Sequence, residues 1–325
     1  MLWRRWHSCT PARLVALTGM SENGGSGAKV QTLIEEKLLK IASKSAGISS
    51  PRDHRFYDAH RNDDAYTTVY DSLGFDMNLC GFSLSGKILD LGSGCGTFVK
   101  VCSAHGLDAT GVEPDNDVIE VARLKGVGHD IVKGVGEFLP FREGSFDIVA
   151  SMSVLEHVKD PRRVVLESVR VLKSKGVLWL DAPDYSRCFH EGHYGLFWIP
   201  LMPKRIAKLY VRARGRIDAA YVDSIQYVTR SEVMNTLRGL RVKIIDVGKA
   251  KTDYVKEYAR TSSTEKAQRP ETVSVRALRT LLTILKRIGF SEKTLAKLCL
   301  VFYSLQILKS RLRHDAMFVM IVQKL

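Results

Sequence analysis

Residues 87–96, K-I-L-D-L-G-S-G-C-G, hold residue types that could bind a nucleotide-like ligand. An apolar stretch leads to Asp90, and Gly92, Gly94 and Gly96 follow at every second position. Glycine lets a ligand lie against bare backbone, because a Cβ would hold the ligand away. An apolar strand, an acid and a glycine turn ahead of a helix are typical of the first ligand-binding turn of a doubly wound α/β sheet.

The glycine spacing discriminates between two ligands. A nicotinamide dinucleotide site has the pattern G-x-G-x-x-G, but here the third glycine, Gly96, comes one residue early and Thr97 occupies the position that the pattern needs. The spacing and the preceding Asp90 instead resemble motif I of the class I S-adenosylmethionine (SAM) methyltransferases. SAM has no pyrophosphate but carries a cationic sulfonium, so an acid beside the loop suits it.

Further motifs of that family follow in order. Residues 109–112 read as a second strand that ends in Glu113, 21 residues beyond Gly92, where an acid can accept hydrogen bonds from both ribose hydroxyls. Residues 134–141, G-V-G-E-F-L-P-F, resemble the family's G-x-A-E-x-L-P-F. The resemblance implies that Gly136 and Glu137 lie by the adenine edge.

Residues 146–157, F-D-I-V-A-S-M-S-V-L-E-H, resemble the family's fourth strand and catalytic loop with its L-E-H signature. The resemblance implies that Ser151, near the end of that strand, belongs to the cofactor site. It covers residues 86–181 and implies an α/β fold with a Rossmann-like, seven-stranded SAM methyltransferase sheet and helical insertions. It also implies SAM as the cofactor of a methyltransferase.

Methyl transfer from SAM is a direct displacement, so the protein must align the acceptor and, for a hydroxyl acceptor, remove a proton. Three histidines near the carboxyl edge of the sheet are the candidate catalytic residues: His157, His190 and His193. Three neighbours in the insertion 182–228 are the candidate substrate-binding residues: Tyr185, Arg187 and Tyr194. That insertion follows strand five, where open α/β sheets receive substrate.

The stretch H-E-G-H at 190–193 invites a metal interpretation. It is not H-E-x-x-H, because its two histidines stand three residues apart and no third ligand is evident. The sequence therefore predicts no metal site.

The chain outside the core divides by composition. Met20 could be the true start, or residues 1–20 could be a transit-like leader with Arg4, Arg5 and Arg13 and no acid. An amphipathic pattern predicts a helix over 30–44, and two helical stretches are predicted at 275–288 and 295–312. The predicted parts are a disordered tail (1–28), a helical extension (29–85), the methyltransferase core (86–247 plus 314–325, with the substrate cap 182–228) and a basic helical insertion (248–313).

The net charge of +14 is concentrated outside the core. Segments 201–216 and 274–313 carry net charges of +6 and +8, which together equal the whole excess. Two interpretations remain open: solvated helix faces, or attraction to an anionic partner such as a phospholipid surface, a diphosphate-linked substrate or RNA. Six scattered cysteines without a C-x-x-C pair, and no run of 18 apolar residues, indicate a cytoplasmic protein, with peripheral membrane contact under the second interpretation.

The resulting hypothesis is an O-methyltransferase acting on a sugar, a lipid-linked or another small-molecule acceptor. Ubiquinone-pathway enzymes share L-E-H but carry an acid where this chain has Ser153, and RNA-base enzymes have an N-P-P-Y-like tetrapeptide that residues 151–154 lack, so nucleic acid is not the expected partner. A quinone-type, an RNA-methylating and a non-catalytic SAM-binding protein stay open as alternatives. The intact Asp90 and Glu113 speak against the last.

Overall fold

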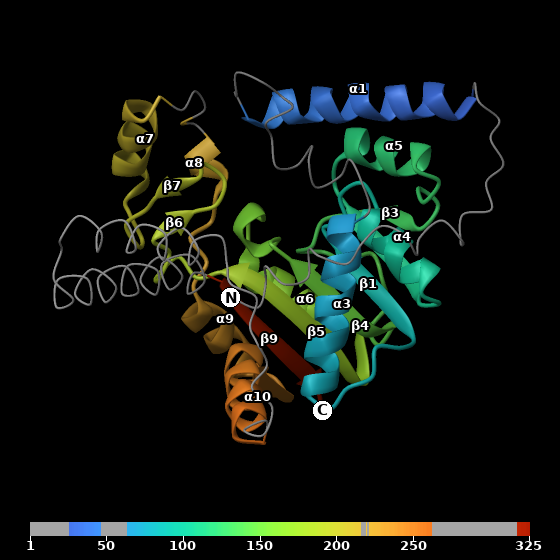
Figure 1. The fold of residues 1–325 in the computed structure, drawn as a ribbon, viewed down its shortest axis with the longest axis vertical. Coiled ribbons are helices and arrows are strands. Elements are labelled where there is room, and N and C mark those ends of the chain that lie inside the picture. Colours follow the sequence, from blue (N-terminus) through green and yellow to red (C-terminus); the bar gives the residue numbers. More distant parts are fainter. Residues whose placement is uncertain (1–25, 47–63, 216–218, 220, 262–316) are drawn as a thin grey trace, which may run out of the picture.

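The computed structural model describes residues 26–46, 64–215, 219, 221–261 and 317–325 (Figure 1). Its centre is a seven-stranded sheet with the order β3-β2-β1-β4-β5-β9-β8. The strands are β1 (Lys87–Leu91), β2 (Asp108–Glu113), β3 (Ile131–Lys133), β4 (Phe146–Met152), β5 (Leu172–Pro183), β8 (Val242–Asp246) and β9 (Met317–Lys324).

Strand direction confirms the predicted fold class. Strands β1 to β5 pair in parallel, whereas β9 lies antiparallel between β5 and β8. The strand order reverses between β1 and β4, which are neighbours in the sheet. Ligands of open α/β sheets bind outside the carboxyl ends of the strands at such a reversal, so the topology fixes where a site is expected.

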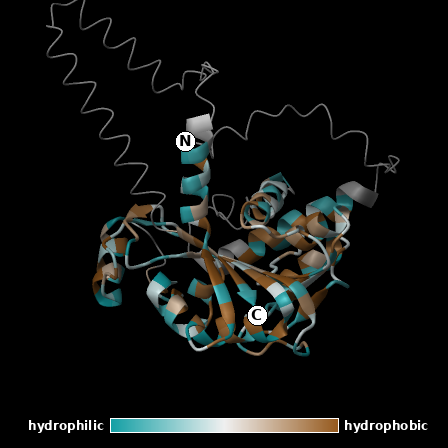
Figure 2. Ribbon diagram, turned by 90° about the horizontal axis from the view of Figure 1, so that it is seen from below, coloured by the Kyte–Doolittle hydropathy of each residue, from teal (hydrophilic) through white to brown (hydrophobic). Residues whose placement is uncertain are grey.

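Helices cover both faces of this sheet. One face packs against α6 (Pro161–Val171) and α9 (Arg230–Leu237). The other packs against α3 (Asp64–Leu79), α4 (Thr97–Ala104), α5 (Asn116–Leu124) and α10 (Val247–Thr261). Along β1, Leu89 and Leu91 enter the first core and Ile88 the second, as the two-residue period of a strand requires. Figure 2 shows the hydrophobic strands between helices whose outer faces are hydrophilic.

Local signals in the sequence explain where two of the helices begin. Asp160 accepts a hydrogen bond from the Arg163 N–H at 3.0 Å, and Pro161 occupies the first turn of α6. At α9, Thr229 and Glu232 form a reciprocal capping box. Both helices therefore begin at residues whose side chains satisfy the first free backbone N–H groups.

The helix predicted at 30–44 is α1 (Ser26–Ala46), which begins four residues before the predicted start. Its apolar stripe, Ile34, Leu38 and Ile41, packs against Cys95 and helix α5, and Figure 1 shows α1 crossing over α5. The N-terminal extension is therefore attached beside the glycine loop. The rest of the predicted tail lies outside the described residues.

The predicted substrate cap is a small unit with its own core. It contains the hairpin β6 (His190–Glu191) and β7 (Leu196–Phe197), and helices α7 (Lys204–Ala213) and α8 (Tyr221–Ser224). Trp198, Tyr185 and Val211 are fully buried in that core. In Figure 1 the cap lies beside the end of the sheet at which the chain leaves β5. This is the carboxyl end of the parallel strands, where a ligand is expected.

The predicted insertion 248–313 begins with α10, whose first residue Val247 packs on the sheet. The helices predicted at 275–288 and 295–312 lie outside the described residues. Among the helices that the structure describes, none is long and apolar enough to cross a membrane.

Candidate active site

A cavity of about 760 Å³ lies at the carboxyl ends of β1, β2 and β4, where the strand order reverses. Its walls come from the glycine loop, the end of β2, the G-V-G-E-F-L-P-F segment and the chain that follows β4. The lining residues are Leu91, Gly92, Val112, Glu113, Pro114, Val135, Gly136, Glu137, Phe138, Met152, Ser153, Val154, His157, Val158, Lys159, Asp160 and Arg163.

The three glycines of the loop have different tasks. Gly92 lines the cavity at φ 73°, and a Cβ there would lie 2.7 Å from Val154 Cγ2. Gly94, at φ 53°, donates its N–H to Glu113 Oε2 at 3.1 Å. Gly96, at φ 71°, packs so closely that a Cβ would meet Val127 at 2.7 Å. All three are in the left-handed region that favours glycine, but only Gly92 forms part of the cavity wall.

Glu113 ends β2 at the cavity, as the sequence predicts. Its two carboxylate oxygens accept hydrogen bonds from the Gly94 N–H and, at 3.0 Å, from the Asp115 N–H. Burial raises its pKa, and these two backbone donors counteract that shift. The side chain is thereby held in place, and each oxygen keeps a second lone pair for a ligand hydroxyl.

Asp90 lies behind this wall and is only 3% exposed. Burial, and then the nearby charge of Glu113, raises the pKa of Asp90 to about 8. Tyr66 of α3 lies close enough for the Asp90 charge to contribute to the raised pKa of its hydroxyl. A buried pair of acids is costly without a cation, so this end of the cavity suits a positively charged ligand.

The remaining predicted cofactor residues divide into two groups. Gly136 and Glu137 line the cavity, and Glu137 Oε1 also accepts the N–H groups of Lys159 at 2.8 Å and Asp160 at 3.3 Å. Ser151 lies inside β4, where its buried Oγ has no hydrogen-bond partner among the described residues. The wall is formed instead by the residues after it, including Ser153, whose φ of 50° is unusual for a non-glycine residue.

These residues fit SAM. Bare backbone at Gly92, an anchored carboxylate at Glu113 and the apolar surface of Phe138, which is 65% exposed, match a nucleoside. The buried Asp90 matches a cation. Sequence reasoning missed Phe138, although it stands inside the quoted motif directly after Glu137.

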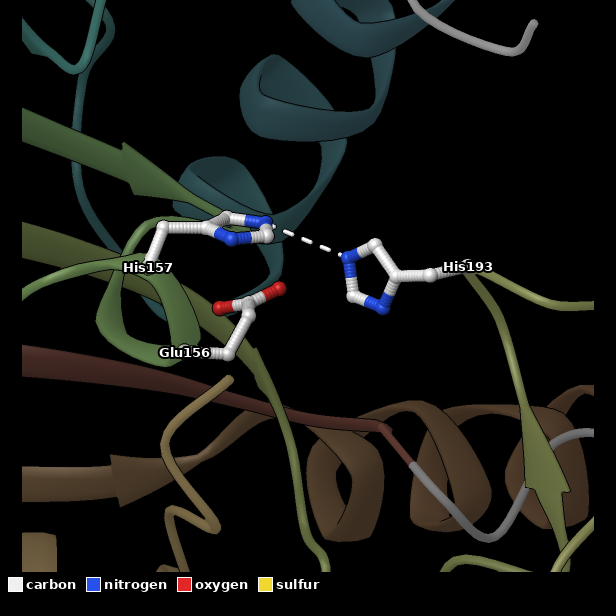
Figure 3. Close-up of side chains that lie close together, drawn as sticks. All are labelled: Glu156, His157 and His193. Carbon is white, nitrogen blue, oxygen red and sulfur yellow. Dashed lines mark hydrogen bonds between the residues drawn. The ribbon is translucent and has the colours of Figure 1, made fainter. Parts of the chain in front are cut away.

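A cluster of acids and histidines adjoins the cavity through His157, which lines it. Figure 3 shows three members of this cluster, Glu156, His157 and His193. Glu156 and His157 come from the 3₁₀ helix η4 (Leu155–His157), and His193 comes from the turn between β6 and β7. His193 Nε2 lies 3.2 Å from His157 Nε2, and His193 Nδ1 lies 2.6 Å from Glu191 Oε1. Tyr221 of α8 places its hydroxyl 3.4 Å from His157 Nδ1.

Burial and neighbouring charge set the protonation of this cluster. Burial raises the pKa of Glu156 to about 7. Burial, and then the charge of His193, lowers the pKa of His157 to about 4. Burial alone would raise the pKa of Glu191, but its hydrogen bond and charge interaction with His193 bring it below the ordinary value. Around neutral pH, His157 is therefore neutral and Glu191 is ionised.

The structure brings together two of the three predicted catalytic histidines, His157 and His193. His190 lies in β6 opposite Phe197, outside this cluster. Of the predicted substrate-binding residues, Tyr194 donates its N–H to Glu191 Oε2 at 2.8 Å, whereas Tyr185 is buried in the cap and donates its hydroxyl to Glu191 Oε1 at 3.3 Å.

Arg187, the third predicted substrate-binding residue, is exposed and its N–H bonds to the Asp184 carbonyl at 2.9 Å. Sequence reasoning also missed Glu156, Glu191 and Tyr221. The first two stand beside predicted histidines in the sequence. Nothing local marks Tyr221, because only the folding of the cap brings it to His157.

Comparison with known proteins agrees with this geometry. Residues 89–180 match the family of the methyltransferase domain. A methyltransferase from Mycobacterium sp. (strain KMS) is 38% identical over 128 residues, which cover 39% of this chain and 50% of that protein. The ubiquinone biosynthesis O-methyltransferase of Xanthomonas oryzae is 32% identical over 100 residues, 29% of this chain and 42% of that protein.

Among solved structures, a SAM-dependent methyltransferase from Archaeoglobus fulgidus overlaps with 81% of this chain and 95% of its own at 13% identity, with a TM-score of 0.45. The chain spans about half the length of the curated relatives it matches, or less. The matched segment contains the glycine loop, Glu113, the cavity wall and η4. Residues 89–180 therefore match a methyltransferase domain, and the cavity-lining residues lie within this match.

Proposed function

We propose that this protein transfers the methyl group of SAM to a hydroxyl of a sugar, a lipid-linked or another small-molecule acceptor. One observation supports this above the others: a single residue, His157, lines the cofactor cavity and also contacts the cap's His193. The wall of the cofactor cavity and the cluster of histidines and glutamates therefore meet at His157. An acceptor bound under the cap would reach both.

SAM supplies, when bound, a methyl group on a sulfonium that an acceptor oxygen can attack. The glycine wall and Glu113 hold the nucleoside, and Asp90 lies at the end suited to its charge. The acceptor's proton passes to the His157–His193 pair, and the ionised Glu191 stabilises the positive charge that forms on His193. Tyr185 and the Tyr194 N–H fix that carboxylate in turn.

A quinone-type phenol is a second candidate acceptor, favoured by the likeness to the Xanthomonas oryzae ubiquinone biosynthesis O-methyltransferase. A phenol is also a hydroxyl acceptor, so the same histidine pair would serve it. The departure at Ser153, where that family carries an acid, separates this chain from it.

We also propose that the cap rests on an anionic phospholipid surface. On α7, Ile206 and Leu209 are 55% and 65% exposed. The neighbouring Phe197, Ile199 and Leu201 expose further apolar surface. The same helix and its end carry five basic residues, of which Lys208 pairs with Asp223 at 2.9 Å and Lys204 donates to the Asp223 carbonyl: Lys204, Arg205, Lys208, Arg212 and Arg214. Exposed apolar side chains on a helix that also carries basic residues match acyl chains beneath anionic headgroups, and such a surface would bring a lipid-linked acceptor to the cap.

Calorimetric titration with SAM tests whether Glu113 serves cofactor binding and His193 serves only the transfer step. Glu113→Ala should weaken SAM binding about 100-fold, because two hydrogen bonds to a charged group contribute roughly 3 kcal/mol. Glu113→Gln retains one acceptor oxygen, so its affinity for SAM should lie between those of Glu113→Ala and the wild type. His193→Ala should bind SAM like the wild type and yet lose transfer. Absence of SAM binding by the wild type, or equal loss in His193→Ala, would overturn the proposal.

A further inference from the structure

The cluster that adjoins the cofactor cavity has the composition of a metal site. Glu156, His157 and His193 each offer one ligand atom, and these atoms all lie within 4.8 Å of one another. Figure 3 shows the Glu156 carboxylate directed toward the space between the two imidazole rings. Two imidazoles and one carboxylate are the donor set of many catalytic zinc centres, which keep a further position open.

The two histidine rings approach each other as ligands of one ion do. Their Nε2 atoms are 3.2 Å apart. Two nitrogens bound to the same tetrahedral Zn²⁺, each at 2.0–2.1 Å, would be about 3.3 to 3.4 Å apart. Two neutral rings whose Nε2 atoms both face inward as lone pairs would repel, so the pair needs either a shared proton or a cation.

Partners on the far side of each ring direct both Nε2 atoms inward. His193 Nδ1 lies 2.6 Å from the buried Glu191, so Nδ1 carries the hydrogen and Nε2 presents a lone pair. His157 Nδ1 faces the Tyr221 hydroxyl at 3.4 Å. A carboxylate that holds the second nitrogen of a histidine is the usual support of a metal ligand.

Glu156 supplies the observation that favours a cation over a shared proton. Its side chain is 2% exposed, and Oε2 has no hydrogen-bond partner among the described residues. A proton shared between the two imidazoles would leave this oxygen unsatisfied, at the cost of an unpaired buried polar group. A cation among the three side chains would satisfy all of them.

We propose that Glu156, His157 and His193 bind one divalent transition-metal ion, with Zn²⁺ favoured by the N₂O donor set. His157 lines the cofactor cavity, so the open coordination positions would receive the acceptor's hydroxyl oxygen. With the ion bound, coordination would lower the pKa of that hydroxyl and let its proton leave to water. The histidines would then act as metal ligands, in place of the base role that the proposed function gives them in the metal-free protein. The acceptor's part rests on the proposed function, whereas metal binding does not. The proposal replaces the sequence-based expectation of no metal.

The test uses the full chain, freed of metal by chelation and titrated with Zn²⁺ against a chromophoric chelator. One ion per chain is expected, and His157→Ala, His193→Ala and Glu156→Gln should each weaken binding at least 10- to 100-fold. His190→Ala, on the same hairpin but outside the cluster, is the matched control and should bind like the wild type. Circular dichroism and thermal unfolding show that each variant is folded, because SAM binding could itself change in His157→Ala.

Co²⁺ loading gives a second readout, because a tetrahedral site should produce visible absorption that the His193→Ala protein lacks. Absence of stoichiometric Zn²⁺ binding, or binding that survives all three ligand substitutions, would overturn the metal site. Because no acceptor is present in these assays, a failure of the proposed methyl transfer leaves their outcome unaffected.

Discussion

Asp90→Asn tests two effects of the buried acid that precedes the glycine loop. The acid should lower the stability of the ligand-free protein, and it should raise the affinity for a cationic ligand. Asp90 is 3% exposed at the carboxyl end of β1, and burial followed by the charge of Glu113 raises its pKa to about 8. An unfolded chain has an aspartate pKa of about 3.9. Between these values the folded state keeps a proton that the unfolded state has lost.

The sign follows from proton linkage. Because the folded pKa is raised, the contribution of Asp90 to stability is most favourable below about pH 4, falls as pH rises and levels off above the folded pKa of about 8. The slope in that window is about 1.4 kcal/mol per pH unit. Asparagine does not titrate. The free energy of unfolding of Asp90→Asn, relative to that of the wild type, should therefore rise by roughly 2–3 kcal/mol from pH 6 to pH 8.

Urea unfolding of both proteins without SAM, at several pH values from 6 to 9, measures that gain. Asp108→Asn is the matched control, because it makes the same substitution at an aspartate that is 68% exposed at the start of β2. Titration with SAM supplies the second half of the prediction: Asp90→Asn should bind at least tenfold more weakly at pH 8, because it lacks the negative charge that lies behind the cavity wall.

Two results would refute this reasoning. A stability difference between wild type and Asp90→Asn that stays constant from pH 6 to pH 9 would mean that the pKa of Asp90 is not raised. Equal SAM affinity in the two proteins would mean that Asp90 does not serve the cofactor's charge.

Three further predictions concern the scaffold, the cap and the membrane surface. Lys251→Met should cost about 3 kcal/mol of stability in urea, because it leaves the buried Asp76 without the ion pair at 2.6 Å. Trp198→Ala should cost about 3 to 5 kcal/mol, because it empties the core of the cap, and should expose the cap to limited proteolysis. Ile206→Glu combined with Leu209→Glu should abolish flotation with phosphatidylglycerol vesicles while SAM binding persists.

Each of the three has a control. Lys249→Met removes a neighbouring exposed lysine and should leave stability within about 0.5 kcal/mol. Proteolysis of Trp198→Ala that cuts the sheet domain as readily as the cap would show that the cap is not a separate unit. Val255→Glu, which changes an exposed apolar residue of α10, should leave flotation intact, and equal loss there would contradict a membrane surface on α7.

The sheet and the cofactor wall were predictable because they depend on local signals. The glycine turn after Asp90 and the acid at Glu113 lie within short motifs whose strand–turn–helix geometry is fixed by their own residues. The N-terminal capping residue Asp160 of α6 and the capping box at Thr229 of α9 likewise act within one helical turn. The topology then follows from alternating strands and helices.

The acceptor side was predictable only in part, because it is assembled across long sequence distances. His157 and His193 are 36 residues apart, and Tyr221 lies another 28 residues along the chain. The hairpin β6–β7 and helix α8 bring them together through the buried core of the cap. The sequence does not show which distant residues the folded cap will bring beside each histidine. For this reason His190 and His193 could not be told apart.

Transfer of a labelled methyl group from SAM tests the central claim most directly. The purified full chain is incubated with methyl-labelled SAM and a fractionated extract of its own source, and label is counted in lipid, polysaccharide, small-molecule, RNA and protein fractions. We predict label in a hydroxyl-bearing lipid, glycan or small-molecule fraction that depends on His193. Label confined to RNA or protein, or no transfer by a protein that binds SAM, would contradict the account.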